Sequence, residues 1–159
     1  MINSVAFHPT LPLLASCSYE RIIKLWDLSQ NPPTLKATLP GHIRQVQTLA
    51  FHPTLFLLAS GSADYTIVLW DFSQNPPTNE STTQVHNSSV SSVAFHPTLP
   101  LLASGSYDRT VKLWDCSQNR LTLIETLSGH TLEVTSVAFH PTLPLLASCA
   151  GDGTVKIYQ

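Results

Sequence analysis

At 159 residues the chain is long enough for one domain with a hydrophobic core. It is 43% hydrophobic, which predicts folding rather than disorder, and only 11% charged, so uncharged polar residues must cover much of the surface. The net charge of −2 and the scattered lysines and arginines argue against a nucleic-acid or membrane-surface partner, and no apolar run is long enough to span a bilayer.

One thirteen-residue segment occurs four times along the chain. The segment SVAFHPTLPLLAS begins at Ser4, Ser92 and Ser136, and its variant TLAFHPTLFLLAS begins at Thr48. The spacing is 44 residues each time, and residues 4–31 differ from residues 92–119 at only five of 28 positions. A period of about 40–45 residues predicts a propeller-type array, in which each repeat must stack on its neighbours to bury its faces.

Each repeat is predicted to contain short strands and no helix. SVAF at 4–7 forms the first strand and PLLAS at 12–16 the second, because the intervening proline cannot donate to a sheet ladder. GSAD and GSYD provide turn residues before a β-branched third strand, TIVLW or TVKLW, and SQNPP or SQNR ends that strand. A weaker fourth strand follows in TLKATL and LTLIETL.

The chain resembles the WD-repeat β-propeller family over essentially its whole length. The resemblance depends on Gly41-His42 and Gly129-His130, on LLASGS with a following Asp, and on Trp-Asp at 26–27, 70–71 and 114–115. It implies an all-β propeller of four-stranded antiparallel blades, four per chain. We place these blades at 1–38, 39–82, 83–126 and 127–159, with the last blade lacking its outer strand.

The resemblance also implies a buried hydrogen-bonded tetrad in each blade, in which an indole N–H donates to a hydroxyl, and an imidazole links that hydroxyl to a carboxylate. In the first repeat Glu20 stands for Asp and no His is present, and in the fourth Tyr158 stands for Trp, so these two networks depart from the pattern. The expected members are Ser16, Glu20 and Trp26; His42, Ser60, Asp64 and Trp70; His86, Ser104, Asp108 and Trp114; and His130, Ser148, Asp152 and Tyr158.

Ser, His and Asp together also compose a hydrolase triad. Here the set recurs once per repeat and ends on an aromatic residue, so we favour a structural role and expect no catalytic residue. A zinc ring built from His8, His52, His96 and His140 is disfavoured, because equivalent positions on separate blades lie far apart.

The three cysteines, Cys17, Cys116 and Cys149, are an odd number without metal-ligand spacing, and we expect small buried side chains. The N-terminal segment lacks the features of a signal peptide. These observations predict a reducing, cytoplasmic compartment, with no metal and no cofactor.

Four blades are fewer than the seven or eight that usually close a ring in this family. An open half-ring exposes the apolar faces of blades 1 and 4 and a free strand edge at TVKIYQ, and such surfaces promote association. We therefore predict a homodimer that forms an eight-bladed ring, with blade 4 of one chain on blade 1 of the other. A four-bladed monomer and a fragment of a longer natural or engineered protein are the alternatives.

The resemblance implies a non-catalytic scaffold that binds proteins or peptides on the face near the narrow opening of the ring. A self-assembling module without a specific ligand is the main alternative, and an enzyme would need a unique polar pocket that near-identical repeats do not offer. The candidate binding residues are Asn3, Tyr19, Gln45, Gln47, Ala63, Ser89, Ser91, Tyr107, Glu133 and Thr135.

Overall fold

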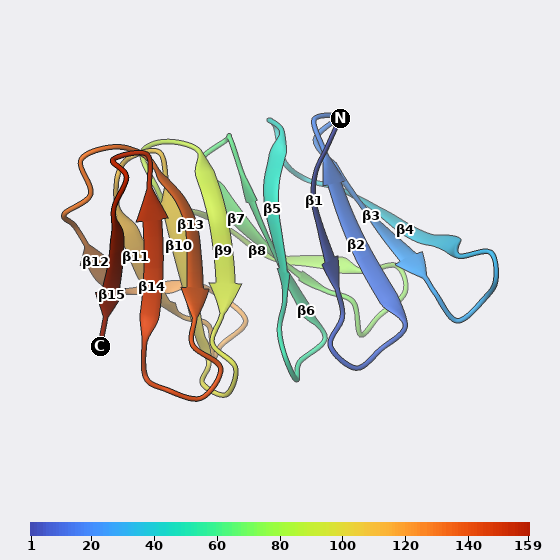
Figure 1. The fold of residues 1–159 in the computed structure, drawn as a ribbon. Helices are drawn as coiled ribbons and strands as arrows, with labels where there is room; N and C mark the ends of the chain where they lie inside the picture. Colours follow the sequence, from blue (N-terminus) through green and yellow to red (C-terminus); the bar gives the residue numbers. More distant parts are fainter.

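The computed structural model describes all of residues 1–159 and contains only strands and their connections (Figure 1). The strands form four antiparallel sheets, called blades 1 to 4 below; three have four strands and the last has three. Blades 1 and 2 comprise β1 (Ile2–Phe7), β2 (Leu13–Ser18), β3 (Ile22–Asp27), β4 (Thr34–Pro40), β5 (Val46–Phe51), β6 (Leu57–Ser62), β7 (Thr66–Asp71) and β8 (Thr78–Gln84). Blades 3 and 4 comprise β9 (Val90–Phe95), β10 (Leu101–Ser106), β11 (Val111–Asp115), β12 (Thr122–Leu127), β13 (Val134–Phe139), β14 (Leu146–Ala150) and β15 (Val155–Tyr158). The expected all-β, antiparallel fold is confirmed.

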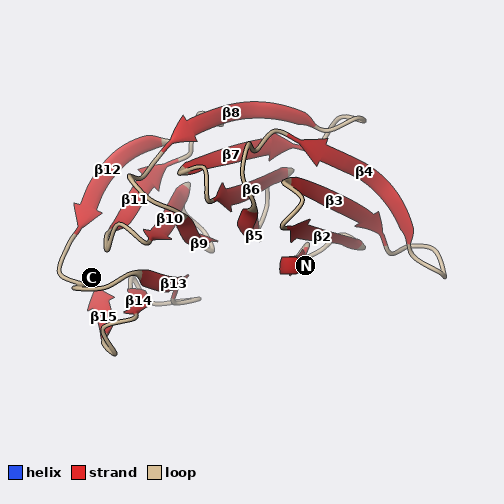
Figure 2. Ribbon diagram, turned by 90° about the horizontal axis from the view of Figure 1, so that it is seen from above, coloured by secondary structure: helices blue, strands red, loops and turns tan.

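The four blades stand side by side around an open arc. Figure 2, viewed from above, shows β5, β9 and β13 on the concave side and β4, β8 and β12 on the convex side. Successive strands pair within each blade, so the chain runs from the inside of a blade to its outside and then starts the next blade on the inside. The arc is open between blade 1 and blade 4, and closure into an eight-bladed ring stays a prediction.

The turn between the first and second strands of every blade depends on its histidine. In blade 1, the Nδ1 atom of His8 accepts the backbone N–H groups of Thr10, at 3.2 Å, and Leu11, at 3.0 Å. His52, His96 and His140 accept the corresponding pairs of N–H groups in the other blades. The histidine before each proline therefore satisfies backbone donors that the turn leaves unpaired.

The outer strand β8 is formed by TNESTTQ, which has no apolar residue. It pairs with β7 from Thr66↔Gln84 to Asp71↔Thr78. The sequence analysis identified outer strands in the apolar segments TLKATL and LTLIETL but named none here. Backbone pairing, rather than side-chain burial, forms this strand.

The structure corrects the role expected of Gly61 and Gly105. Both glycines were assigned to turns, yet they lie inside β6 and β10. A Cβ atom on Gly61 would stand 2.6 Å from Cγ1 of Val90, and one on Gly105 would stand 2.7 Å from Cγ1 of Val134. Glycine is needed at these positions because the next blade packs directly against the strand, and the turn begins two residues later.

The hydrophobic core lies between blades rather than within them. One buried cluster joins Ile23 and Leu25 of blade 1 to Val46, Leu49 and Phe51 of blade 2. Two further clusters join blade 2 to blade 3 and blade 3 to blade 4. Each junction, called a seam below, therefore buries one face of each of its two blades. The structure has no helix that could cross a membrane.

Candidate functional site

The tetrad residues of blade 2 form one continuous hydrogen-bonded chain. Trp70 Nε1 donates to Ser60 Oγ at 2.8 Å, and Ser60 Oγ lies 2.7 Å from His42 Nε2. His42 Nδ1 lies 2.9 Å from Asp64 Oδ2. Because Ser60 can donate to Nε2, the imidazole is assigned its proton on Nδ1, where it donates to the carboxylate. The network links β6 and β7 to two loops at one end of the blade. His42 lies in the loop before β5, and Asp64 lies in the turn between β6 and β7.

Blades 3 and 4 repeat this arrangement. In blade 3, Ser104 Oγ lies 2.9 Å from Trp114 Nε1 and 2.7 Å from the imidazole of His86, whose other nitrogen lies 2.8 Å from Asp108. In blade 4 the hydroxyl of Tyr158 replaces the indole, 3.2 Å from Ser148 Oγ. Ser148 lies 2.8 Å from His130, which lies 3.2 Å from Asp152. Tyrosine therefore preserves the connection with slightly longer distances.

Blade 1 keeps only one link of the network. Trp26 Nε1 donates to Ser16 Oγ at 2.9 Å, while Glu20 is exposed and its carboxylate makes no hydrogen bond. A small pocket of 130 Å³ lies beside Ser16, Lys24 and Trp26. In the other three blades an imidazole contacts the corresponding serine. Blade 1 therefore lacks the part of the network that joins the serine to a turn carboxylate.

A threonine completes each full network, and the sequence analysis missed it. Thr66, Thr110 and Thr154 donate their hydroxyls to the Oδ1 atoms of Asp64, Asp108 and Asp152, and their backbone N–H groups bond the same atoms. The pattern Asp-x-Thr in repeats 2 to 4, against Glu-Arg-Ile in repeat 1, carried this information.

These contacts hold the three aspartates in the ionised form. Burial opposes ionisation of Asp64 and Asp108, but hydrogen bonds from His42 or His86 and from the neighbouring threonine outweigh it and lower the pKa of each carboxyl. The Thr154 hydroxyl and the Thr131 backbone N–H chiefly lower the pKa of Asp152.

The Ser-His-Asp sets are sealed against substrate. Ser60 and Ser104 are 0% exposed and Ser148 is 2% exposed. Each hydroxyl also contacts the aromatic residue of the third strand, whereas a nucleophile must face a pocket. The geometry therefore favours a structural role for the sets. No three His, Cys, Asp or Glu side chains lie close enough together to hold a metal ion.

The three thiols are unpaired. Cys17 and Cys116 are buried, and burial raises the pKa of each thiol to about 11. Cys149 is partly exposed on the outward face of blade 4.

The candidate binding residues fall into three groups, which are exposed, buried and partly buried. Tyr19 and Tyr107 are 56% and 50% exposed, in turns at the same end of the molecule as the N-terminus (Figure 1), and Thr135 is also exposed. Ala63 is only 7% exposed; its backbone N–H donates to the Gln45 carbonyl, but Tyr19 and Tyr107 make the equivalent bond, so this bond does not account for its burial. Ala63 therefore offers little accessible surface, contrary to expectation. The partly buried members are Asn3, Gln45, Gln47, Ser89, Ser91 and Glu133.

Two of the partly buried residues already bind the adjacent blade. Asn3 Nδ2 donates to the Val46 carbonyl at 2.8 Å, and Ser91 Oγ donates to the Val134 carbonyl at 2.5 Å. Both side chains connect neighbouring blades, which leaves them less free to bind a partner protein.

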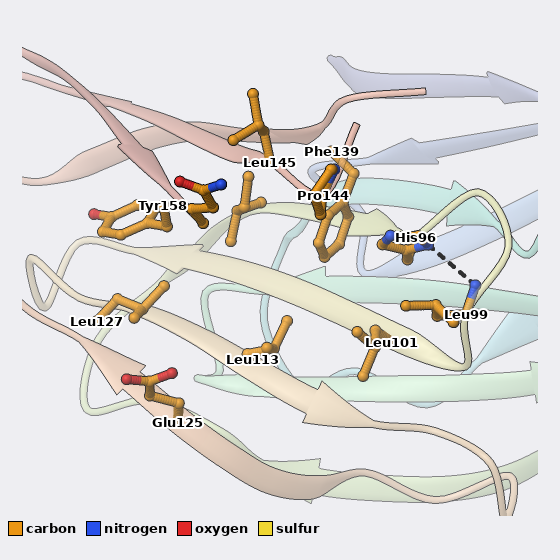
Figure 3. Close-up of a pocket in the computed structure, with 12 residues that line it drawn as sticks. His96, Leu99, Leu101, Leu113, Glu125, Leu127, Phe139, Pro144, Leu145 and Tyr158 are labelled. Carbon is orange, nitrogen blue, oxygen red and sulfur yellow. Dashed lines mark hydrogen bonds between the residues drawn. The ribbon is translucent and has the colours of Figure 1, made fainter. Parts of the chain in front are cut away.

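An apolar pocket of 340 Å³ lies between blades 3 and 4, beside β15 (Figure 3). Figure 3 shows Leu101, Leu113 and Leu127 of blade 3 on one side and Tyr158 and Phe139 on the other. The polar residues that line the pocket, His96, Glu125 and Gln159, form no hydrogen bond with one another, so it does not have the convergent polar groups of an active site.

Comparison with known proteins agrees with this geometry. The family model described as "WD domain, G-beta repeat" matches residues 1–27, 33–71, 78–115 and 121–159. The chain belongs to the WD-repeat family. The last three WD repeats each begin at an outer strand and end with the third strand of the next blade. The tetrad histidine, between those strands, thus lies in the same repeat as its aromatic partner.

One curated relative shares a single WD-repeat length with the chain. A segment of 45 residues is 49% identical to part of the nuclear distribution protein PAC1-2 of Uncinocarpus reesii (strain UAMH 1704). The match covers 28% of this chain and 9% of that protein.

Proposed function

We propose that the chain is a non-catalytic scaffold for protein–protein interaction and that two copies assemble into a closed, eight-bladed propeller. The observation that carries the scaffold proposal is the burial of the Ser-His-Asp sets, which fixes the loops of three blades without offering a nucleophile to solvent. WD-repeat domains generally bind other proteins, and this supports the same function. We retain the blade divisions near residues 39, 83 and 127 and a cytoplasmic location as parts of this proposal.

The two end faces support assembly with a second copy. In blade 1, Ile2, Val5 and Phe7 are 61%, 58% and 70% exposed, whereas their counterparts Val46, Leu49 and Phe51 are buried against blade 1. In blade 4, Val155 and Ile157 are 69% and 67% exposed, whereas their counterparts Ile23 and Leu25 are buried against blade 2. The end face of blade 1 thus has the composition of the blade 2 side of an internal seam. The end face of blade 4 has the composition of the blade 1 side of that seam.

The internal seams also supply a template for specific contacts. The ring of His8, His52 or His96 packs on the ring of Phe51, Phe95 or Phe139 in the next blade, at 5.1, 4.9 and 5.0 Å. In the two later seams a backbone N–H, of Val93 or Val137, donates to the hydroxyl of Thr48 or Ser92. By the same frame, His140 would pack on Phe7 of a second copy, and Ser136 would accept the Val5 N–H of that copy.

The alternative is a self-assembling module, or part of a longer WD-repeat protein, without a ligand of its own. The exposed end faces fit this alternative equally well, because any chain with the matching seam residues could cover them. The short match to the nuclear distribution protein carries no role over to this chain.

Affinity capture tests the scaffold function. A Tyr19→Ala, Tyr107→Ala double variant should lose the proteins that the unmodified chain retains, because tyrosines commonly anchor protein interfaces. Leu123→Ala, at an exposed site on the outer strand of blade 3, is the matched control and should retain them. An unchanged set of captured proteins with the double variant would contradict a scaffold that uses this face.

A further inference from the structure

The exposed turns between the second and third strands differ from blade to blade in a regular way. Blades 1 and 3 carry Tyr-x-Arg, at Tyr19-Glu20-Arg21 and at Tyr107-Asp108-Arg109. Blade 2 carries Ala63-Asp64-Tyr65 at the same place, and blade 4 carries two glycines, Gly151 and Gly153. In a chain of near-identical repeats, a pair of residues confined to alternate blades is not required by the turn itself.

The backbone conformation of this turn is the same in all four blades. Arg21 and Arg109 have φ angles of 68° and 73°, in the left-handed region that disfavours residues with a side chain. Tyr65 and Gly153 adopt φ angles of 73° and 75° at the same position in blades 2 and 4, so the left-handed conformation belongs to the turn and glycine fits it without strain. The chain nevertheless has arginine there in blades 1 and 3, where both side chains are exposed. The positive φ therefore belongs to the turn, and what distinguishes the arginines is their exposed cationic side chain.

The arginines on this end of the molecule have no acidic partner within the chain. The only ion pairs join His42, His86 and His130 to Asp64, Asp108 and Asp152. Those carboxylates also accept bonds from their threonines and from backbone N–H groups, so they do not pair with Arg21 or Arg109. Arg44, in the loop before β5, is also exposed and adds a third unpaired cation.

We propose that the Tyr-x-Arg turns of blades 1 and 3 form a docking site for an extended acidic segment of a partner protein. Its carboxylates pair with Arg21 and Arg109, and Tyr19 and Tyr107 supply flat apolar contacts beside them. Blade 2 lies between these two blades. It has the small, buried Ala63 in the equivalent turn, and Arg44 in the loop before β5. This inference rests on the proposed scaffold function and specifies the chemistry of the partner.

A peptide is favoured over a nucleic acid by charge. Binding a phosphate backbone draws on many cations, whereas this face offers three arginines. Exposed Glu20 and partly buried Glu133 lie in the same set of turns and loops, so the peptide must place its few carboxylates at the arginines and away from these two side chains. A few carboxylates, held bidentately by guanidinium groups and flanked by tyrosines, match the number and type of side chains available.

Fluorescence anisotropy with a synthetic probe tests the site. The probe is a fluorescein-labelled peptide of glutamates interspersed with single leucines; the controls are the same peptide with lysine for each glutamate and a labelled single-stranded DNA. The test variant is Arg21→Gly with Arg109→Gly, because glycine already occupies this turn position in blade 4. The control variant is Arg120→Ala, an exposed arginine at the opposite end of β11.

The glutamate peptide should bind the unmodified chain, and the double variant should weaken that binding about tenfold or more, as loss of interface anchors does. Arg120→Ala should leave the affinity unchanged. Equal binding by the double variant, or equal binding of the lysine peptide, would overturn the inference. Tighter binding of the DNA would replace it with a nucleic-acid site.

Affinity capture separates this inference from the scaffold function. Partners that the Arg21→Gly, Arg109→Gly variant retains but the double tyrosine variant loses would leave the scaffold in place and overturn the acidic specificity. Partners unaffected by either double variant would contradict both. The thermal melting curve of each variant, matched to that of the unmodified chain, verifies that the fold is intact.

Discussion

The seam between blades 1 and 2 and the outward face of blade 4 have similar side chains in different surroundings. Ile23 and Leu25 are 0% and 1% exposed in the seam, whereas Val155 and Ile157, at the same positions of the last repeat, are 69% and 67% exposed. Every repeat thus has apolar side chains on the same face of its blade. That face is buried only where a neighbouring blade packs against it. The apolar pattern of a propeller repeat therefore identifies which face of a blade packs against a neighbour. It does not identify the neighbour, which depends on how many blades are present.

The largest expected effect comes from truncating Leu25 in the seam and its counterpart Ile157 on the face of blade 4. Leu25→Ala should lower the free energy of unfolding by about 3 kcal/mol, because it opens a cavity in a packed seam. Ile157→Ala should cost a similar amount if a second copy covers that residue, and the cost should fall as the protein is diluted. Chemical denaturation at several protein concentrations measures both effects. A negligible, concentration-independent cost for Ile157→Ala would show that the face of blade 4 stays exposed.

The tetrads offer a second matched pair. Ser104→Ala removes the shared partner of Trp114 and His86 and should lower stability by about 2 kcal/mol, since it leaves buried polar groups unsatisfied. Ser16→Ala removes a single bond to the half-buried Trp26 and should cost about 1 kcal/mol or less. Urea denaturation of the two variants gives the comparison. Equal costs would contradict a special contribution from the complete network.

Mild acid should produce a smaller effect through the turn histidines. Burial lowers the pKa of His8 and His52, and the Nδ1 atom of each accepts two backbone N–H groups in the folded state. The unfolded chain, with histidine pKa values of about 6.5, then binds more protons than the folded chain, so stability should fall as pH drops below about 6.5. His52→Asn keeps an acceptor without titrating in this range.

Denaturation between neutral pH and pH 5 should therefore show a shallower loss of stability for His52→Asn than for the unmodified chain. A second loss should appear as pH falls below about 4, because the folded-state pKa values of Asp64, Asp108 and Asp152 are lowered and these groups favour folding only while ionised. An identical slope for His52→Asn and the unmodified chain in mild acid would contradict the role of the turn histidine.

The recurring frame made the repeat architecture predictable from the sequence, and the resemblance to the WD-repeat family implied the members of the tetrads. The resemblance placed Ser60, Asp64 and the loop histidine in one network with Trp70, and the structure joins these residues by hydrogen bonds. Contacts between repeats were not predictable in this way. Gly61 looks like a turn residue until Val90 of the next blade is placed 2.6 Å from its missing Cβ.

The binding face shows the same limit. Frame position alone could not distinguish Asn3 and Ser91, which bond the adjacent blade, from Tyr19 and Tyr107, which face solvent. A fourth strand was expected in blade 2, but the residues of β8 were not located in the sequence, because its pairing is a property of the backbone and its seven residues carry no apolar alternation. Sequence periodicity reports what each repeat does for itself, whereas these features depend on its neighbours.

The mass in solution tests the central claim, that the end faces of blades 1 and 4 cover each other in a pair of chains. Light scattering on a size-exclusion column should give twice the chain mass of 17.4 kDa for the unmodified protein. Phe7→Asp, which places a charge on the exposed face of blade 1, should give 17.4 kDa, and Ile124→Asp, on the outer strand of blade 3, should keep the doubled mass. A mass of 17.4 kDa for the unmodified chain would contradict the paired ring.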